Sequence, residues 1–255
     1  SSEVVWAQND GRGNFTIRQN IPNGNGDFIQ GAVAGILRGK QIALSWHGKG
    51  EGIQFLTIPE NPAVTSWGRT VTATANQEED LSLSDIDRDG KNDLLLGTKW
   101  LRNANDGWSS HTISNKPGDP DRNALADINQ DGRLDAIVGF EAINELGKFV
   151  WYEQPVDSTK EWIEHIISTN VIGPMSLDVA DMDDDGDLDI VVGEHDYRDS
   201  GSPSLLIFEN INKGATWGGP YIVYTGDEHH DGAQVVDIDN DGDLDIISIG
   251  WVNNK

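Results

Sequence analysis

Four short acidic stretches, DIDRDGKND (85–93), DINQDGRLD (127–135), DMDDDGDLD (181–189) and DIDNDGDLD (237–245), decide the fold of this chain. Each has oxygen-bearing side chains at its first, third, fifth and ninth positions and glycine at its sixth. An apolar run follows each stretch: LLLG, AIVG, IVVG and IISI. Successive copies start 42, 54 and 56 residues apart, and this regular spacing indicates a structural repeat.

The alternating acidic side chains predict metal binding. In an EF-hand loop, residues 1, 3 and 5 and the backbone carbonyl of residue 7 surround calcium, and glycine at 6 permits the sharp turn. Here we expect flanking strands instead of helices, with aspartate at the ninth position. Carboxylates held this close repel one another unless a cation neutralises them. We therefore expect about four structural calcium ions, with weaker binding in the copy that contains Asn129.

The predicted ligands fall into four sets, in which the seventh residue contributes its carbonyl oxygen. They are Asp85, Asp87, Asp89, Lys91 and Asp93; Asp127, Asn129, Asp131, Arg133 and Asp135; Asp181, Asp183, Asp185, Asp187 and Asp189; and Asp237, Asp239, Asp241, Asp243 and Asp245.

Composition narrows the class of protein. The 255 residues carry a formal net charge of −25, and nucleic-acid binding, which needs a basic surface, is therefore not expected. The absence of cysteine excludes disulfides and zinc-thiolate sites. No apolar run is long enough to insert into a membrane. We expect an extracellular or periplasmic protein, because external calcium is concentrated enough for weak carboxylate sites, and either a monomer or a module of a larger protein.

The segments between the acidic stretches predict an all-β propeller. Each repeat reads as strand, acidic hairpin, strand, loop, strand, turn and strand, and four antiparallel strands per repeat are typical of a propeller blade. We expect one domain, 1–255, with five blades. The predicted blades are residues 27–75, 77–114, 119–169, 172–225, and 229–255 together with 1–20. The first of these has no acidic hairpin.

The two ends of the chain are predicted to share the last blade. The stretch EVVWAQN (3–9) matches the third strands FVWYEQ and LLIFEN, and GNFTIRQ (13–19) matches the fourth strands. The N-terminal strands would therefore complete the blade begun near residue 233 and close the ring, leaving no open sheet edge. The alternative is a fragment of a larger propeller.

The acidic hairpins, the strand ends of two apolar residues and glycine, and GNFT at 13–16 resemble FG-GAP/VCBS repeats. The resemblance covers almost the whole chain and implies a calcium-binding β-propeller. Relatives include integrin α heads, fungal propeller lectins and several propeller polysaccharide lyases. This family commonly has seven blades, and five are expected here, so no site of a seven-bladed relative is transferred. The fold alone does not specify a function.

Several aromatic residues recur at one position of the repeat, and we expect them to pack between blades. They are Trp67, Trp108, Trp162, Trp217 and Phe15 at the start of fourth strands, and Trp6, Trp100 and Trp151 in third strands. His111 and His165 share the pattern W-x-x-H and are also expected to be structural.

Residues that do not recur mark a candidate ligand face. The loops from second to third strands lie opposite the acidic hairpins, together with the links between blades. Predicted ligand-binding residues there are Trp46, His47, Lys99, Glu141, His195, Asp196, Tyr197, Arg198, His229, His230 and Trp251. An ordinary polar rim is the simpler alternative, and a zinc site at His195, His229 and His230 is a weaker one.

The resemblance and this face together suggest a secreted, calcium-stabilised propeller that binds carbohydrate, either a lectin or a polysaccharide-binding module. One alternative is a polysaccharide lyase, with His195 or His230 as base, Tyr197 as acid, and Lys99 or Arg198 neutralising the uronate. Glycoside hydrolysis would instead use a carboxylate pair drawn from Glu141, Glu194 and Asp196. The third alternative is a protein-interaction module. Whether the chain is an enzyme stays open, with binding preferred.

Overall fold

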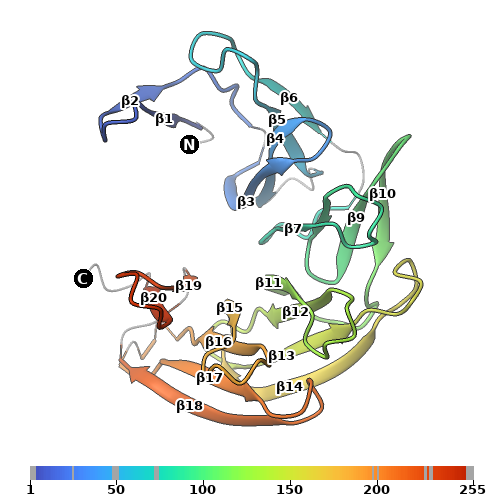
Figure 1. Ribbon diagram of the computed structural model, residues 1–255, viewed down its shortest axis with the longest axis vertical. Helices are drawn as coiled ribbons and strands as arrows, with labels where there is room; N and C mark the ends of the chain where they lie inside the picture. Colours follow the sequence, from blue (N-terminus) through green and yellow to red (C-terminus); the bar gives the residue numbers. More distant parts are fainter. Residues whose placement is uncertain are drawn as a thin grey trace. The chain divides into compact units, whose positions relative to one another are not determined.

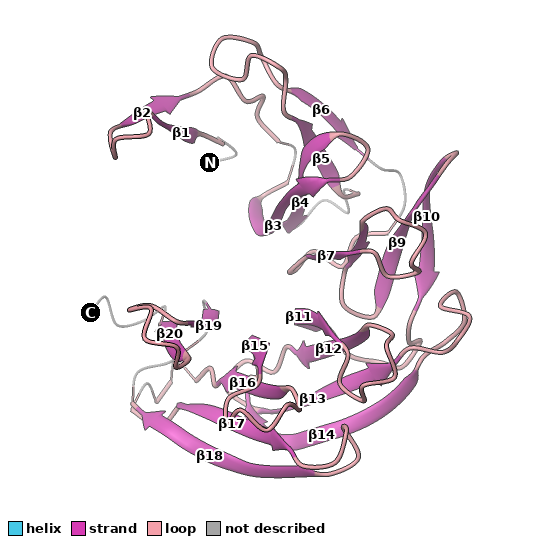
Figure 2. Cartoon of the chain, in the orientation of Figure 1, coloured by secondary structure: helices cyan, strands magenta, loops and turns pink. Residues whose placement is uncertain are grey.

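A computed structural model describes residues 4–24, 26–47, 52–71, 75–196, 198–199, 201–226, 229 and 232–250. These residues form 20 strands and no helix (Figure 2), which confirms the predicted all-β class. Among them there is accordingly no helix long and apolar enough to span a membrane. The chain forms two compact units, residues 1–111 and 112–255.

The first unit contains a hairpin and two four-stranded sheets (Figure 1). The hairpin is β1 (Trp6–Asn9) and β2 (Phe15–Arg18). The first sheet is β3 (Phe28–Ile36), β4 (Lys40–His47), β5 (Gln54–Thr57) and β6 (Gly68–Val71), in that order. The second is β7 (Ser82–Ser84), β8 (Asp93–Leu95), β9 (Lys99–Ala104) and β10 (Gly107–Thr112), also in sequence order.

The second unit repeats this arrangement. One sheet is β11 (Pro120–Ala126), β12 (Asp135–Phe140), β13 (Leu146–Glu153) and β14 (Ile163–Ile172). The next is β15 (Ser176–Ala180), β16 (Asp189–Gly193), β17 (Ser204–Asn210) and β18 (Trp217–Thr225). A hairpin of β19 (Gly232–Val236) and β20 (Asp245–Ile249) follows. The first strands β11, β15 and β19 lie side by side within this unit.

Burial explains why the second strands read as continuous apolar runs. Every residue of β12 and β16 is buried, and β16 lies between the β11–β14 sheet and the β19–β20 hairpin of the same unit. The outer strand β18 is half-exposed or exposed along its whole length. Gly139 ends the apolar run of β12, where a Cβ atom would lie 2.1 Å from the carbonyl oxygen of Pro174 in the link to the next sheet.

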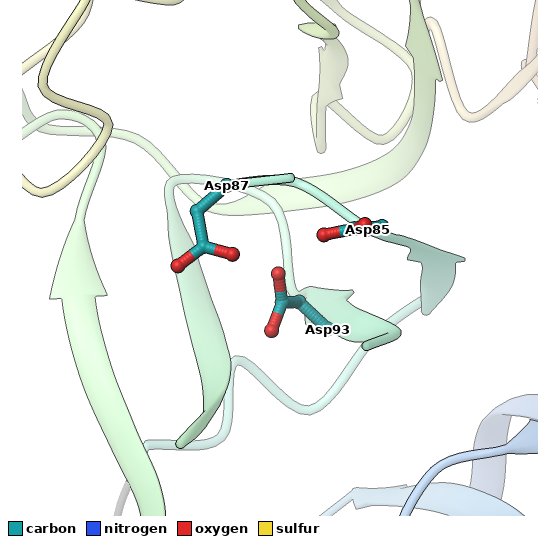
Figure 3. A group of neighbouring side chains, drawn as sticks. All are labelled: Asp85, Asp87 and Asp93. Carbon is teal, nitrogen blue, oxygen red and sulfur yellow. The ribbon is translucent and has the colours of Figure 1, made fainter. Parts of the chain in front are cut away.

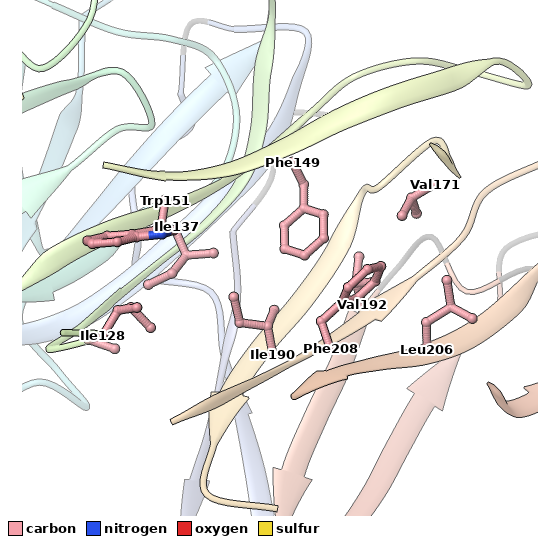
Figure 4. Close-up of a cluster of buried hydrophobic side chains, with 10 residues drawn as sticks. Ile128, Ile137, Phe149, Trp151, Val171, Ile190, Val192, Leu206 and Phe208 are labelled. Atoms are coloured by element: carbon pink, nitrogen blue, oxygen red, sulfur yellow. The ribbon is translucent and has the colours of Figure 1, made fainter. Parts of the chain in front are cut away.

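The core lies between sheets rather than within them. In the second unit, Phe149 of one sheet packs edge-to-face on Phe208 of the next, with ring centroids 5.0 Å apart (Figure 4). Ile137, Ile190 and Val192 complete the centre of this cluster and are fully buried. Stacked faces of this kind are expected of neighbouring propeller blades.

Most recurrent aromatics pack as the repeat predicts. Trp67, Trp100, Trp151 and Trp162 are buried, and Trp6 lies 5.7 Å from Trp67 between the β1–β2 hairpin and the next sheet. The histidines of the W-x-x-H pattern contact third-strand tryptophans: His165 stacks on Trp151 at 4.2 Å, and His111 lies tilted against Trp100 at 4.9 Å. Phe15 departs from the pattern and is 62% exposed, in a hairpin of only two strands.

The described residues therefore form four four-stranded sheets, which have the strand order of propeller blades. The five-blade count and the closure of the ring by the N-terminal strands stay predictions, because β1–β2 and β19–β20 form separate two-stranded sheets in different units.

Candidate metal centres and candidate ligand face

Each acidic stretch folds as a hairpin loop wrapped around its own carboxylates. In the third loop, the Asp181 carboxylate accepts the backbone N–H groups of Asp185 at 3.1 Å and Gly186 at 3.0 Å. Oδ1 of Asp183 accepts the N–H of Asp185 at 3.3 Å. The first carboxylate accepts the same two donors in the other three loops. One backbone path is therefore built four times.

This path needs two residues in the left-handed region. Gly186 at the sixth position has φ +93°, and Asp184 at the fourth has φ +62°. The equivalent fourth residues Arg88, Gln130 and Asn240 also have positive φ. The sequence pattern identified the sixth position, since glycine adopts this region without steric cost. It missed the fourth, where aspartate and asparagine are tolerated but arginine and glutamine give no signal.

The aspartate at the ninth position ties the loop to the sheet. Asp189 is 1% exposed, and its two oxygens accept the N–H groups of Met182 in the loop and Asn210 in the third strand, both at 2.9 Å. Asp93 and Asp135 are fully buried and make the equivalent pairs of bonds. Asp245 accepts the N–H of Ile238 at 3.0 Å but is exposed, in a sheet of only two described strands.

The first, third and ninth carboxylates converge. Their ligand atoms lie within 4.8 Å of one another in the groups Asp85–Asp87–Asp93, Asp181–Asp183–Asp189 and Asp237–Asp239–Asp245. Figure 3 shows the first group, with the carboxylates of Asp87 and Asp93 facing each other and Asp85 beside them. In the second loop, Oδ1 of Asn129 accepts the N–H of Asp131 at 3.0 Å, so the amide oxygen takes the place of a carboxylate oxygen. These sets could hold metal ions.

The fifth carboxylates point to other partners. Among the described residues, the converging groups contain positions one, three and nine only. Asp89 instead lies 2.8 Å from Nζ of Lys91, and Asp131 is paired with Arg133. In all four loops the fifth carboxylate also accepts the N–H of the seventh residue. A ligand role for positions five and seven therefore stays a prediction.

Electrostatics explains why the converging groups suit a cation. Burial, together with the neighbouring loop carboxylates, raises the pKa of Asp93 to about 6 and the pKa of Asp135 to about 7. Burial likewise raises the pKa of Asp189, with Asp183 and Asp185 adding to the effect. A divalent cation would favour the ionised carboxylates and reverse these shifts. An all-oxygen donor set fits the hard cations calcium and magnesium.

The sheet without an acidic loop provides an internal comparison. Gln41 precedes Ile42, which pairs with Leu56, just as Asp135 precedes Ala136, which pairs with Tyr152. Gln41 is therefore the ninth-position equivalent. Its side chain accepts the N–H of Arg38 at 3.3 Å and donates to Oγ1 of Thr57 at 3.0 Å. In this sheet, which has no acidic loop, a neutral amide replaces the buried carboxylate. A buried carboxylate at the ninth position is therefore found, among the described sheets, only in those that also have the other carboxylates of an acidic loop.

In the first unit, the candidate ligand face differs from the prediction. Trp46 is fully buried and packs with Leu44 and Trp67, so its ring offers no surface to a ligand, contrary to its predicted ligand-binding role. Links from the preceding strands cover it, because a Cβ atom on Gly24 would lie 2.1 Å from its ring. The His47 side chain is 47% exposed and stacks on Phe28 at 4.7 Å. Lys99 begins β9 and is partly exposed.

In the second unit, the predicted face contains buried acid and imidazole groups. His195 is 1% exposed and His229 is 6% exposed, so neither offers an open surface to a polymer. The Glu194 carboxylate accepts the N–H groups of Ile172 and Ser204, both at 2.9 Å, and burial raises its pKa. These bonds hold two loops together, which is a structural role. Nδ1 of His229 lies 2.7 Å from Oγ of Ser248.

The structure does bring two of the predicted loops together. The N–H of Arg198 donates to Oδ1 of Asn144 at 3.4 Å, and its guanidinium binds the carbonyl oxygen of Asn144. Nε of Arg198 lies 3.6 Å from Asp196, and Glu141 is exposed nearby in the chain. Tyr197, His230 and Trp251 lie outside the described residues. Among the described residues, the converging metal-ligand groups are all aspartates and include neither His195 nor His229.

Comparison with known proteins supports the repeat. An FG-GAP-like repeat model matches residues 85–138, which contain the first two acidic loops and the strands between them. No curated protein matches the chain. The match covers this part of the chain and carries no information on a ligand or an activity.

Gly186→Ala tests the loop geometry. No atom lies within 4 Å of the added Cβ, so the cost arises only from the left-handed backbone, with φ at +93°. We expect a loss of about 1–2 kcal/mol in the free energy of unfolding, measured by chemical denaturation. Gly201→Ala is the control, because Gly201 has no left-handed φ and an ordinary 3.7 Å contact. Equal losses in both variants would contradict the loop assignment.

Proposed function

We propose that this chain is a calcium-stabilised, propeller-like module that binds carbohydrate outside the cell. The convergence of the first, third and ninth carboxylates in three of the four acidic hairpins carries the calcium part of the proposal. Calcium takes six to eight oxygen ligands in flexible geometry, which suits carboxylates supplemented by backbone carbonyls and water. Bound calcium would supply positive charge that the converged carboxylates need.

The ion would act on the fold rather than on a substrate. The ninth aspartate already bonds the acidic hairpin of its own sheet to the third strand of that sheet. Asp189, for example, accepts the N–H groups of Met182 and Asn210. A cation shared with the first and third carboxylates would lock the hairpin to the same point. Calcium that binds the folded state alone stabilises it by about 2.7 kcal/mol per site at a hundredfold excess over Kd.

Support for the carbohydrate part comes from the loops that follow β12 and β16, which contact each other through Asn144 and Arg198 and which we call the loop cluster. Glu141 and the Arg198 side chain, which is 59% exposed, present both charge signs at the sheet ends opposite the metal hairpins, and the less exposed Asp196 lies beside Arg198. Planar polar side chains of this kind suit sugar hydroxyls. The burial of His195 disfavours it as the base of a lyase and leaves His230 for that role. The structural bonds of Glu194 leave Glu141 and Asp196 as the carboxylate pair of a hydrolase.

One observation favours a protein-interaction module as the second candidate. The outer strand β18 exposes consecutive apolar residues, with Tyr221 52%, Ile222 66% and Tyr224 50% exposed. A long, exposed, apolar edge strand is a template for pairing with another chain.

We also propose that the β1–β2 hairpin completes the sheet begun by β19 and β20, giving five blades. The repeat supports this: EVVWAQN has the pattern of a third strand, which places Asn9 at the position of Gln154 and Asn210. Exposure within the last hairpin also supports it. Ile247 is 41% exposed, whereas its equivalents Ile137 and Val191 are fully buried.

Calcium removal tests the proposal directly. We expect EDTA to lower the melting temperature and calcium to restore it, because each bound ion adds stability to the folded state alone. Asp183→Asn removes one converging carboxylate and should reduce the calcium-induced rise, whereas Asp106→Asn, in the exposed β9–β10 turn, should not. A melting temperature that is the same with EDTA and with calcium would eliminate the metal part of the proposal.

The loops should fill in a defined order. Arg102 forms an ion pair with Asp87, and its Nη2 lies 3.7 Å from Asp89, so the first loop carries competing positive charge. The stretches 181–189 and 237–245 contain no basic residue. We therefore expect the first loop, rather than the Asn129 loop, to bind calcium most weakly.

The glycine amides at the sixth position report each loop separately by NMR, since each donates to the first carboxylate of its loop. During a calcium titration, Gly186 and Gly242 should shift first and Gly90 last. Arg102→Leu should strengthen the first loop by about tenfold, on the order of 1.4 kcal/mol. Arg18→Leu, in β2, is the control. Unchanged titration of Gly90 in Arg102→Leu would refute the competition.

Deletion of residues 1–20 tests closure. If these residues complete the last blade, their loss exposes a sheet edge, and the truncated chain should aggregate or melt well below the full chain. Size-exclusion chromatography and a thermal scan measure both effects. A monomeric truncated chain with unchanged melting temperature would rule out closure by this hairpin.

A glycan array, followed by incubation with uronic-acid polysaccharides, separates the candidate functions. We expect array binding without the new absorbance of an unsaturated product. Arg198→Met should weaken binding by about tenfold through loss of a charged hydrogen bond, whereas Lys213→Met, on an exposed turn, should leave it unchanged. Product formation would favour the lyase, and an array without any signal would favour the protein-interaction module.

A further inference from the structure

A pocket of about 350 Å³ lies in the second unit, away from the metal loops and the loop cluster. Residues 113–117, in the link after β10, line one side, and Glu161, Trp162 and Glu164, at the start of β14, line the other. Its volume falls in the range of small-molecule sites, about 300–1,000 Å³. No predicted site residue contributes to it.

Three bonds fix the walls of this pocket, which we call the rim pocket. The N–H of Trp162 donates to the carbonyl oxygen of Ile113 at 2.9 Å. Nζ of Lys116 donates to Oε1 of Glu164 at 3.0 Å, and the side-chain amide of Asn115 donates to Glu161. The pocket therefore exists before a ligand arrives, which reduces the ordering cost of binding.

The floor of the rim pocket is a charge-balanced network. The Glu164 side chain is 7% exposed, and its Oε2 accepts from the hydroxyl of Tyr152 at 3.0 Å and from Nζ of Lys148 at 3.3 Å. Burial alone would raise the pKa of Glu164, but the bonds from Lys116, Tyr152 and Lys148 lower it overall. Lys116 in the lining and Lys148, which reaches Glu164 from outside the lining, together balance the charges of Glu161 and Glu164, so the pocket has no strong preference for an ion.

The repeat does not require this pocket. At the matching junction in the first unit, the N–H of Trp67 donates to the carbonyl oxygen of Asn20 at 3.1 Å, as Trp162 does to Ile113. Arg69 there stands two residues after the tryptophan, in the place of Glu164. Its guanidinium bonds across the junction to the carbonyl oxygen of Pro22. The acid-and-lysine lining is therefore specific to the rim pocket rather than a packing feature shared by the repeats.

We propose that the rim pocket binds one neutral sugar unit, an inference that rests on the proposed carbohydrate-binding function. Pro117 is exposed and supplies the apolar surface for the C–H face of a pyranose ring, with the edge of the largely buried Trp162 beside it. Asn115, Lys116 and Glu161 supply donors and acceptors for its hydroxyl groups. Balanced formal charge selects a neutral polyol over a uronate or an amino sugar.

The test is a titration of the calcium-loaded full chain with the methyl glycosides of glucose, galactose and mannose, followed by ¹H–¹⁵N NMR. The indole N–H of Trp162, which donates to the carbonyl oxygen of Ser158 at 3.0 Å, is the reporter. At least one glycoside should shift it saturably, and glucuronate and glucosamine should bind more weakly. Glu161→Gln and Lys116→Met should each weaken binding by about tenfold, through loss of a charged hydrogen bond.

The controls are Glu209→Gln and Lys160→Met, which make the same changes outside the pocket, and both should bind as the unchanged chain does. No saturable shift at Trp162 with any glycoside overturns the inference. Tighter binding of glucuronate or glucosamine overturns the neutral ligand class. Array binding that is lost in Arg198→Met but unchanged in Glu161→Gln would refute the rim pocket as a sugar site and would still support the proposed function. An array without any signal would refute carbohydrate binding itself.

Discussion

The carboxylate at the ninth position of the acidic loop, buried in three of the four copies, is the interaction on which the repeat depends. Asp189 receives one N–H from its own hairpin and one from the third strand, so a single side chain joins three strands of the sheet. Leaving such buried N–H groups unpaired would cost about 1–3 kcal/mol each. The first and third carboxylates then gather against this fixed point, and the charge they accumulate creates the need for a cation. Gln41 shows the converse, since an amide suffices where those carboxylates are missing.

This constraint also divides each sheet into two ends. The hairpin ends are specified by repeated residues and are stabilised by local bonds, so they vary little from Asp85 to Asp245. The opposite ends carry the loops and links that differ between repeats, such as the contact of Arg198 with Asn144. The rim pocket is another such difference between repeats. It is lined by Glu164, whereas at the matching junction of the first unit the equivalent residue, Arg69, bonds across the junction to Pro22. Ligand binding can therefore vary without disturbing the loops.

Local features of the fold could be predicted from the sequence, whereas contacts between loops could not. The alternating aspartates and the buried apolar run of β12 are patterns of consecutive residues, so the hairpins and the all-β class could be predicted from the sequence. The burial of Trp46 did not, because Gly24, which lies 22 residues earlier, supplies the backbone that covers it. His195 was likewise placed on an open face, but Gly173 and its neighbours pack against its backbone. The predicted metal ligand Asp89 lies outside the converging group for a similar reason, because it is paired in part with Arg102, which belongs to another strand.

The number of calcium ions bound by the folded chain tests this account most directly. Native mass spectrometry of the full chain, equilibrated with calcium and freed of weakly adsorbed ions, measures that number. The account predicts four calcium ions, one for each acidic loop, and fewer by one when the three converging aspartates of the third loop are replaced by asparagine. A mass that stays at the value of the bare chain, or a count that is unchanged in that variant, would contradict it.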